Sequence, residues 1–143
     1  MNLDDMNVSE ADIPARIQSQ RGPIRGGAAE MDDFVAFLWN KAAWSERTFG
    51  PGARTRGICQ HVRKELAEIE ADPLDLMEWV DVFMLATDGF WRAYLAKHPT
   101  HNKLKAATHF VYLIQEKQRI NEGRTWPPPK SEDEAIEHVR DGE

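Results

Sequence analysis

Residues 65–81 read ELAEIEADPLDLMEWVD, and this stretch decides the fold. Apolar residues at helical spacing come first, Asp72-Pro73 interrupts them, and a second apolar run follows. Because helices end before a proline and often begin with one, we predict two helices, the second with Asp72 as its N-cap and Pro73 as its first residue. Helices joined by so short a turn run antiparallel. The stretch therefore predicts a helical hairpin.

The two helices of this hairpin differ in where their apolar residues lie. The first is expected from Thr55, as N-cap, to Ala71, and one face of it carries Ile58, Val62, Leu66 and Ile69. The second is expected to reach Lys97, and apolar side chains cover nearly every side of it. A helix that is apolar all round is a buried one. In so short a chain, we expect it to pack against a second subunit as well as its own neighbours.

Two further helices are expected on either side of the hairpin. Residues 32–44 show helical spacing with acids in the first turn, and the helix breakers of residues 50–52 follow. Beyond His98-Pro99, residues 100–121 show the same periodicity. With no strand-like alternation of note, the predicted class is all-α, a bundle of four main helices that oligomerises through the third.

The chain is most simply one domain, with a segment at each end that lacks apolar periodicity. Residues 1–30 are rich in glycine and proline and are interpreted as a partly flexible N-terminal arm. Residues 31–129 form the predicted helical domain, and residues 130–143 a polar C-terminal tail.

Composition excludes several classes of protein. A formal charge of −6 disfavours binding to nucleic acid, which needs a basic surface. The sequence has no uncharged apolar stretch of about 18 residues, which argues against a transmembrane helix. The acidic N-terminus is the reverse of a secretory signal, and a single cysteine, Cys59, cannot build a disulfide framework. We therefore expect a cytoplasmic protein that binds neither nucleic acid nor membrane.

The acids of the hairpin form two pairs. Glu65 and Glu68 share a face of the first helix, and Glu78 and Asp81 share a face of the second. A carboxylate among apolar side chains persists in its ionised form only when it is paired or metal-bound. The antiparallel hairpin lets both pairs face each other, and carboxylate oxygens suit Mg²⁺ or Mn²⁺. We predict that all four are metal ligands and catalytic residues.

A simpler interpretation, in which the acids only form a solvated helix face, fits one pair better than the other. Pairs such as Glu65 and Glu68 usually belong to a solvated helix face, whereas Glu78 and Asp81 lie among apolar residues. Asp88 follows Asp81 by two helical turns, and it is either a further ligand or the partner of a buried salt bridge.

Both acid motifs, in this order, resemble those of the MazG-like all-α nucleoside triphosphate pyrophosphohydrolases. The family pattern often has a further glutamate before the first motif, where this chain has Lys64. Residues 44–51, WSERTFGP, look like the dATP/dGTP diphosphohydrolase branch, which includes phage enzymes of purine deoxynucleotide metabolism. Residues 117–127 are similar to the closing motif of that branch, so the resemblance covers residues 32–129.

The resemblance implies a reaction and an assembly. The α–β phosphate bridge of a purine nucleoside triphosphate, dGTP or dATP first, would be hydrolysed to a monophosphate and pyrophosphate in a dimer or tetramer. If the chain is phage-encoded, the compartment would be the host cytoplasm. Two or more Mg²⁺ or Mn²⁺ ions are expected between the acids and the polyanionic substrate.

Further residues are assigned to substrate binding. We expect three side chains, spaced four and three residues apart, to bind the phosphates. They are Lys117, Asn121 and Arg124. The base is expected to meet a set of mostly aromatic residues, which are Trp44, Thr48, Phe49, His61 and Trp126.

Other functions stay open at this point. A non-catalytic helical oligomer or scaffold would keep the aromatic third helix, but it has no use for Glu78 and Asp81. A hydrolase that removes modified nucleotides would use the same acids. A di-iron bundle would need Glu-x-x-His pairs on two helices, and the sequence has none.

Overall fold

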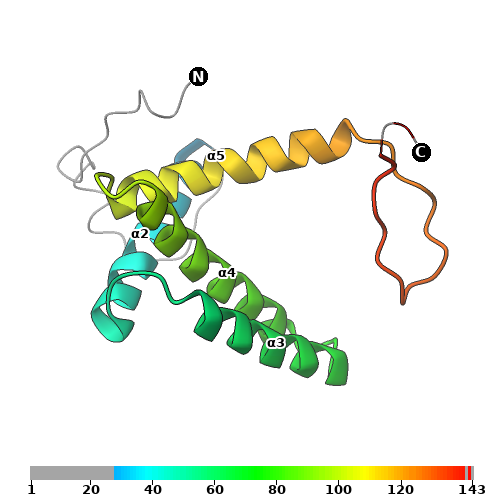
Figure 1. Ribbon diagram of the computed structural model, residues 1–143, viewed down its shortest axis with the longest axis horizontal. Helices are drawn as coiled ribbons and strands as arrows, with labels where there is room; N and C mark the ends of the chain where they lie inside the picture. Colours follow the sequence, from blue (N-terminus) through cyan, green and yellow to red (C-terminus); the bar gives the residue numbers. More distant parts are fainter. Residues whose placement is uncertain (1–27, 141, 143) are drawn as a thin grey trace. The chain divides into compact units, whose positions relative to one another are not determined.

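The computed structural model describes residues 28–140 and 142, with side chains from residue 33 onward. The described residues form helices and no strand, which confirms the all-α class (Figure 1). The helices are α2 (Ala28–Phe49), α3 (Thr55–Ala71), α4 (Leu76–Lys97) and α5 (Lys103–Glu122). The predicted N-terminal arm lies mostly outside the described residues.

The chain divides into two compact units, one that ends at Val111 and one from Tyr112 onward. The first contains α2, α3, α4 and the beginning of α5, and the second contains the rest of α5 and the C-terminal tail. Each unit is described by itself.

The predicted hairpin is present, with α3 and α4 side by side (Figure 1). Its turn differs from the prediction, because Asp75 rather than Asp72 is the N-cap of α4. Asp75 Oδ1 accepts a hydrogen bond from the Met77 amide at 3.0 Å. Asp72 closes the turn instead, accepting from the Leu74 amide at 3.3 Å. The chain needs these extra residues to reverse direction before α4 can start.

The beginning of α3 also differs from the prediction. Thr55 is the first residue of the helix, and Arg54 occupies the N-cap without a capping side-chain bond. The Arg54 carbonyl accepts from the Ile58 amide at 3.0 Å, which completes the first turn. The backbone alone therefore closes this end of the helix.

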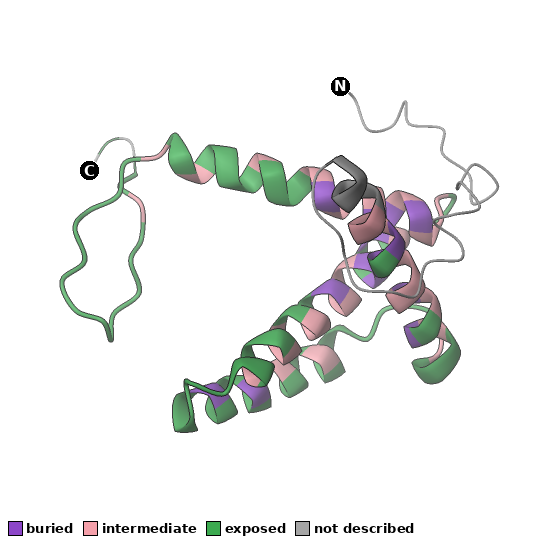
Figure 2. Ribbon diagram, turned by 180° about the vertical axis from the view of Figure 1, so that it is seen from behind, coloured by how far each residue is buried: buried purple, intermediate pink, exposed green. Residues whose placement is uncertain are grey.

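The hydrophobic core lies where α2, the C-terminal half of α4 and the beginning of α5 meet (Figure 2). Small residues let these helices approach closely, and Ala106 is completely buried. The largest core cluster contains Ala42, Trp91, Tyr94 and Ala106. The N-terminal half of α4 extends beyond this core and packs along α3. This half carries Glu78 and Asp81.

A buried arginine attaches the α2–α3 connection to α4. Arg92 is only 2% exposed, and its guanidinium donates to Asp88 Oδ2 at 3.1 Å and to Ser45 Oγ at 3.0 Å. It also donates to the carbonyls of Gly50 and Gly52, both at 2.8 Å. Both glycines have φ near +85°, which side chains other than glycine rarely adopt. The connection therefore depends on these glycines and on Arg92.

We expect Arg92→Ala to destabilise the protein by about 3–5 kcal/mol, because it removes a buried guanidinium and leaves the partly buried Asp88 carboxylate without its charged partner. Urea unfolding followed by circular dichroism measures this change. The matched control is Arg63→Ala, an exposed residue of α3, whose effect should stay within about 0.5 kcal/mol. Equal stability of the two variants would contradict a central role for Arg92.

Candidate active site

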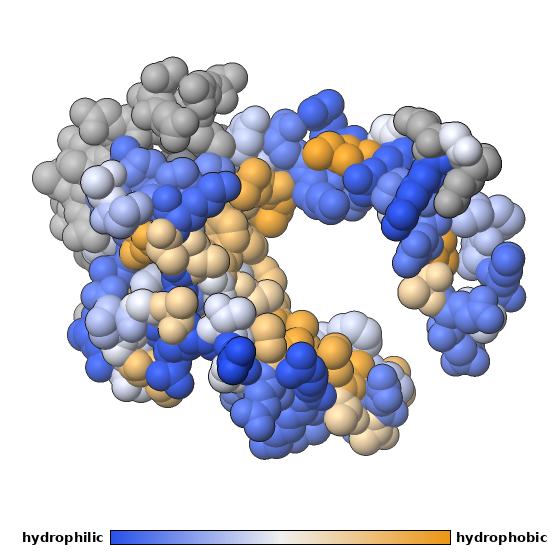
Figure 3. Space-filling view, viewed as in Figure 1, coloured by the Kyte–Doolittle hydropathy of each residue, from blue (hydrophilic) through white to orange (hydrophobic). Residues whose placement is uncertain are grey.

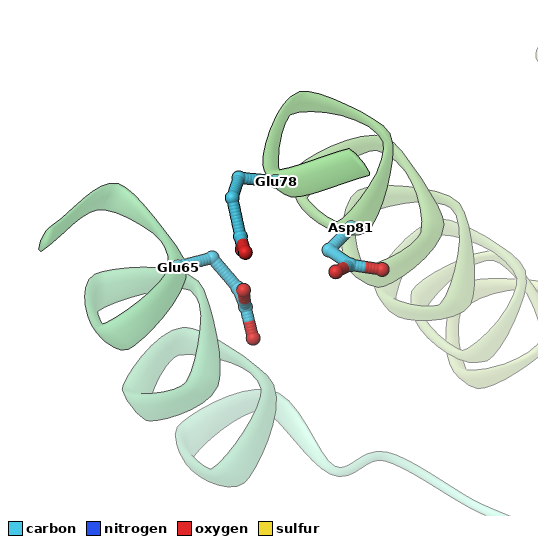
Figure 4. Close-up of side chains that lie close together, drawn as sticks. All are labelled: Glu65, Glu78 and Asp81. Carbon is cyan, nitrogen blue, oxygen red and sulfur yellow. The ribbon is translucent and has the colours of Figure 1, made fainter. Parts of the chain in front are cut away.

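The acids of α3 and α4 converge on the seam between the two helices. Figure 4 shows Glu65 from α3 and Glu78 and Asp81 from α4 directing their carboxylates into this seam. One carboxylate oxygen from each lies within 4.8 Å of the others. Glu68, one turn beyond Glu65, lies near enough to Glu78 to share a hydrogen bond with it. The structure thus brings three of the four acids that the sequence singled out to one point, with Glu68 beside Glu78.

Glu78 has the most perturbed carboxyl group of this cluster. Its pKa is raised from 4.5 to about 7, firstly by desolvation and then by the negative charge of Glu68 and a hydrogen bond with Glu65. Carboxylates this close repel one another, so one of them retains a proton near neutral pH. A divalent cation has the charge to replace that proton, and the all-oxygen donor set fits Mg²⁺ or Mn²⁺.

The burial of the acids is the reverse of what the sequence predicted. Glu65 is buried, at 6% exposed, although it belongs to the more polar helix. Glu78 and Asp81 are partly exposed, and Glu68 is exposed. The reason is packing, because Glu65 and Ile69 lie on the face of α3 that meets α4. Much of the apolar surface of α4 around Glu78, in contrast, is left exposed by the part of the chain that the structure describes.

A cavity of about 370 Å³ adjoins the acids and is formed by α2, α3 and α4. This volume lies within the range of sites that hold small ligands. Its lining combines acids and a histidine, an apolar wall, and polar groups of α2 and α4. Its lining comprises Lys41, Trp44, Ser45, Phe49, His61, Glu65, Asp81, Met84, Leu85 and Asp88.

Three of the five predicted base-binding residues line this cavity. Trp44 and Phe49 meet edge to face, with ring centroids 5.6 Å apart, and form part of its apolar wall. His61 Nε2 lies 2.7 Å from Glu65 Oε1, so this histidine positions an acid of the cluster. Thr48 does not line the cavity, and its hydroxyl donates to the Trp44 carbonyl at 2.8 Å.

The other predicted binding residues belong to the second unit. Trp126 donates to the Asn121 carbonyl at 2.7 Å, and Arg124 donates to Asn121 Oδ1 at 3.4 Å. Lys117 is exposed on α5. The assignment of Lys117, Asn121 and Arg124 to phosphate, and of Trp126 to the base, stays a prediction.

Lys41 is a cavity residue that the sequence did not single out. Its Nζ donates to the Met84 carbonyl at 2.7 Å. Desolvation lowers the pKa of Lys41, Asp88 opposes this shift, and Arg92 adds to it. The sequence signal that could have indicated Lys41 was its spacing. Trp44 and Ser45 follow Lys41 by three and four residues, so all three lie on one face of α2.

Asp88, which the sequence left between two roles, is the partner of a buried salt bridge with Arg92 at 3.1 Å. Desolvation acts to raise the pKa of Asp88, but hydrogen bonds from Ser45, Trp91 and Arg92, with the guanidinium charge, bring it below its ordinary value. Trp91 Nε1 donates to its Oδ1 at 2.7 Å. Its two oxygens are thus already engaged by α4 itself.

Comparison with known families places this site in a functional context. A family model described as dATP/dGTP pyrophosphohydrolase matches residues 37–142. The chain belongs to this family. The match confirms the resemblance found in the sequence and identifies the protein as a nucleotide pyrophosphohydrolase, a hydrolase that acts on nucleoside triphosphates. The family match therefore gives no support to the alternative interpretation as a non-catalytic scaffold.

Two other comparisons add no relative. No curated protein and no solved structure gives a significant match to the chain. Among the described residues of this pyrophosphohydrolase, no helix is long and apolar enough to cross a membrane.

The raised pKa of Glu78 predicts how cation binding depends on pH. Without a cation, the stability that Glu78 contributes is present below pH 4.5 and is lost as the pH rises through about 7, because the folded protein holds this proton more tightly. A cation must displace the proton, so Mn²⁺ should raise the melting temperature more at pH 8 than at pH 5.5. Thermal unfolding with Mn²⁺ or with EDTA at both pH values measures this.

Two variants control that measurement. Glu78→Gln should remove most of the Mn²⁺ effect, whereas Glu70→Gln, on an exposed position of α3, should retain it. An Mn²⁺ effect of the same size at both pH values would contradict the role given to the Glu78 proton.

Proposed function

We propose that this pyrophosphohydrolase cleaves the α–β phosphate bridge of a purine deoxynucleoside triphosphate, dGTP or dATP, in a reaction that depends on Mg²⁺ or Mn²⁺. The products are a nucleoside monophosphate and pyrophosphate. One observation carries the proposal, which is the convergence of carboxylate oxygens within 4.8 Å beside a cavity of about 370 Å³. The proposed metal ligands are Glu65, Glu68, Glu78 and Asp81.

The substrate explains why four acids are gathered here. A triphosphate and a carboxylate cluster repel each other, so they can meet only with cations between them. When bound, these cations neutralise the phosphates, polarise a phosphoryl oxygen and lower the pKa of a bound water. Glu78 would hold a cation in its deprotonated form, and His61 holds Glu65 in position. The water oxygen would bond to phosphorus as the bridging P–O bond breaks. The water proton would pass to a carboxylate of the cluster, and a nucleoside monophosphate and pyrophosphate would be released.

The apolar wall supports a purine base. Trp44 and Phe49 are both about half exposed, which leaves their rings available for contact with a ligand. Met84 and Leu85 of α4 continue this wall. A purine has a larger ring surface to bury than a pyrimidine, so an apolar wall of this kind favours it.

We also propose that a second copy of this chain covers the hairpin, in a dimer or tetramer. Leu74 is 86% exposed and Leu76 is 74% exposed, and further large apolar residues follow on α4. Figure 3 shows apolar side chains gathered along α4 beside the hydrophilic surface of α3. Monomeric proteins rarely leave a continuous apolar surface of this extent in water, so the same surface of another copy is the proposed partner.

The activity is tested with purified protein, each of the common NTPs and dNTPs, and Mg²⁺ or Mn²⁺, with the products separated by anion exchange. We expect dGMP or dAMP with pyrophosphate. Glu78→Gln should lower the rate more than about 100-fold, beyond the loss typical of groups that only support metal ligands. Glu70→Gln is the control. If no substrate yields a monophosphate, the proposal fails, and release of orthophosphate with a diphosphate would overturn the bond assignment.

Light scattering tests the assembly, and we expect at least twice the monomer mass of 16.4 kDa. The double variant Leu74→Lys and Leu76→Lys places charge on the proposed interface, so it should shift the protein toward the monomer. Ile136→Lys, at an exposed position of the C-terminal tail, should leave the mass unchanged. A wild-type protein that scatters as a monomer would contradict the proposed assembly.

A further inference from the structure

The cavity beside the acids has a second polar end, formed by Lys41 and Ser45 of α2 and Asp88 of α4. Asp88 follows Asp81 by seven residues, which is about 10 Å along α4. If the phosphates lie at the acids, as the proposed function requires, a nucleoside that extends along the apolar wall places its base at this second end.

Among the described residues at this end, Lys41 is the group with hydrogen-bond donors left for a ligand. An ammonium group has three N–H donors, and the Met84 carbonyl accepts one of them at 2.7 Å. A helical carbonyl points toward the residue four positions later, so this contact holds the ammonium at the level of Asp88 and away from the acids. Burial lowers the pKa of Lys41, and the Asp88 carboxylate partly offsets this shift by favouring the charged form. The oxygens of Asp88 already accept from Trp91 and Arg92.

An ammonium group distinguishes the two purines by their hydrogen-bonding edges. Guanine presents two acceptors, O6 and N7, on one edge, whereas adenine presents N7 beside an amino group that donates. Lysine only donates, so it is complementary to the first edge and opposed by the amino group of the second. We infer that Lys41 is a specificity-determining residue that binds the O6 and N7 edge of guanine, so that the enzyme prefers dGTP to dATP.

The first test uses the wild-type protein and two pairs of substrates. dGTP and the deoxynucleoside triphosphate of 2,6-diaminopurine differ in the group at position 6, and so do dITP and dATP. We expect kcat/KM to be higher for the 6-oxo member of each pair by at least about 10-fold, within the range that a specific base contact provides. Equal values, or a preference for the 6-amino members, would overturn the inference.

The second test changes the lysine. Lys41→Met should lower the ratio of kcat/KM for dGTP to that for dATP by at least about 10-fold. Lys41→Gln, whose amide both donates and accepts, should bring this ratio close to one, which a purely structural role for Lys41 would not do. Lys97→Met, at the exposed end of α4, should leave the ratio unchanged. If the Lys41 variants lose activity on both substrates equally, Lys41 does not read the base, and the inference is wrong.

Binding measurements separate this inference from the proposed reaction. Analogues of dGTP and dATP with a methylene group between the α and β phosphorus bind but are not hydrolysed, and calorimetry gives their Kd values. A Lys41-dependent preference for the dGTP analogue without hydrolysis of any nucleotide would support the inference and defeat only the proposed reaction. Hydrolysis of dGTP and dATP with no difference in analogue binding would defeat only the inference.

Discussion

The first unit depends on the buried guanidinium of Arg92. Asp88 balances its charge at 3.1 Å, and Ser45, Gly50 and Gly52 accept its remaining hydrogen bonds. A buried charge is costly unless its hydrogen bonds are satisfied, so this group tolerates few positions for the end of α2 and the turn that follows. That constraint holds the segment from Trp44 to Phe49 against α4, and this segment supplies one wall of the cavity.

The carboxylate cluster opposes the stability that the core provides. Glu65 is buried in the seam of the hairpin, and desolvation together with the nearby negative charges raises the pKa of Glu78 to about 7. An arrangement that only stabilised the hairpin would place apolar or oppositely charged residues there. Strained electrostatics of this kind is typical of functional sites, where a ligand of opposite charge relieves it. The family match and the cavity beside the acids agree with this interpretation.

The fold was largely predictable, and the details of burial were not. Apolar periodicity and the Asp72-Pro73 interruption predicted the hairpin, because they depend on neighbours within a few residues. The cap of α4 was misassigned, since Asp72 and Asp75 are both good capping residues and only the path of the turn selects between them. Glu65 appeared to be a surface residue because the composition of a helix does not show which face meets its partner.

The sequence by itself determined the helical class, the spacing of the four acids and the membership of a pyrophosphohydrolase family. Those properties are local, or they lie in the order of motifs along the chain. The tertiary structure decided that Lys41 meets α4 at Met84 beside the cavity, and that Arg92 meets the turn at Gly50. Those contacts join residues more than 40 positions apart, and only packing brings such residues together.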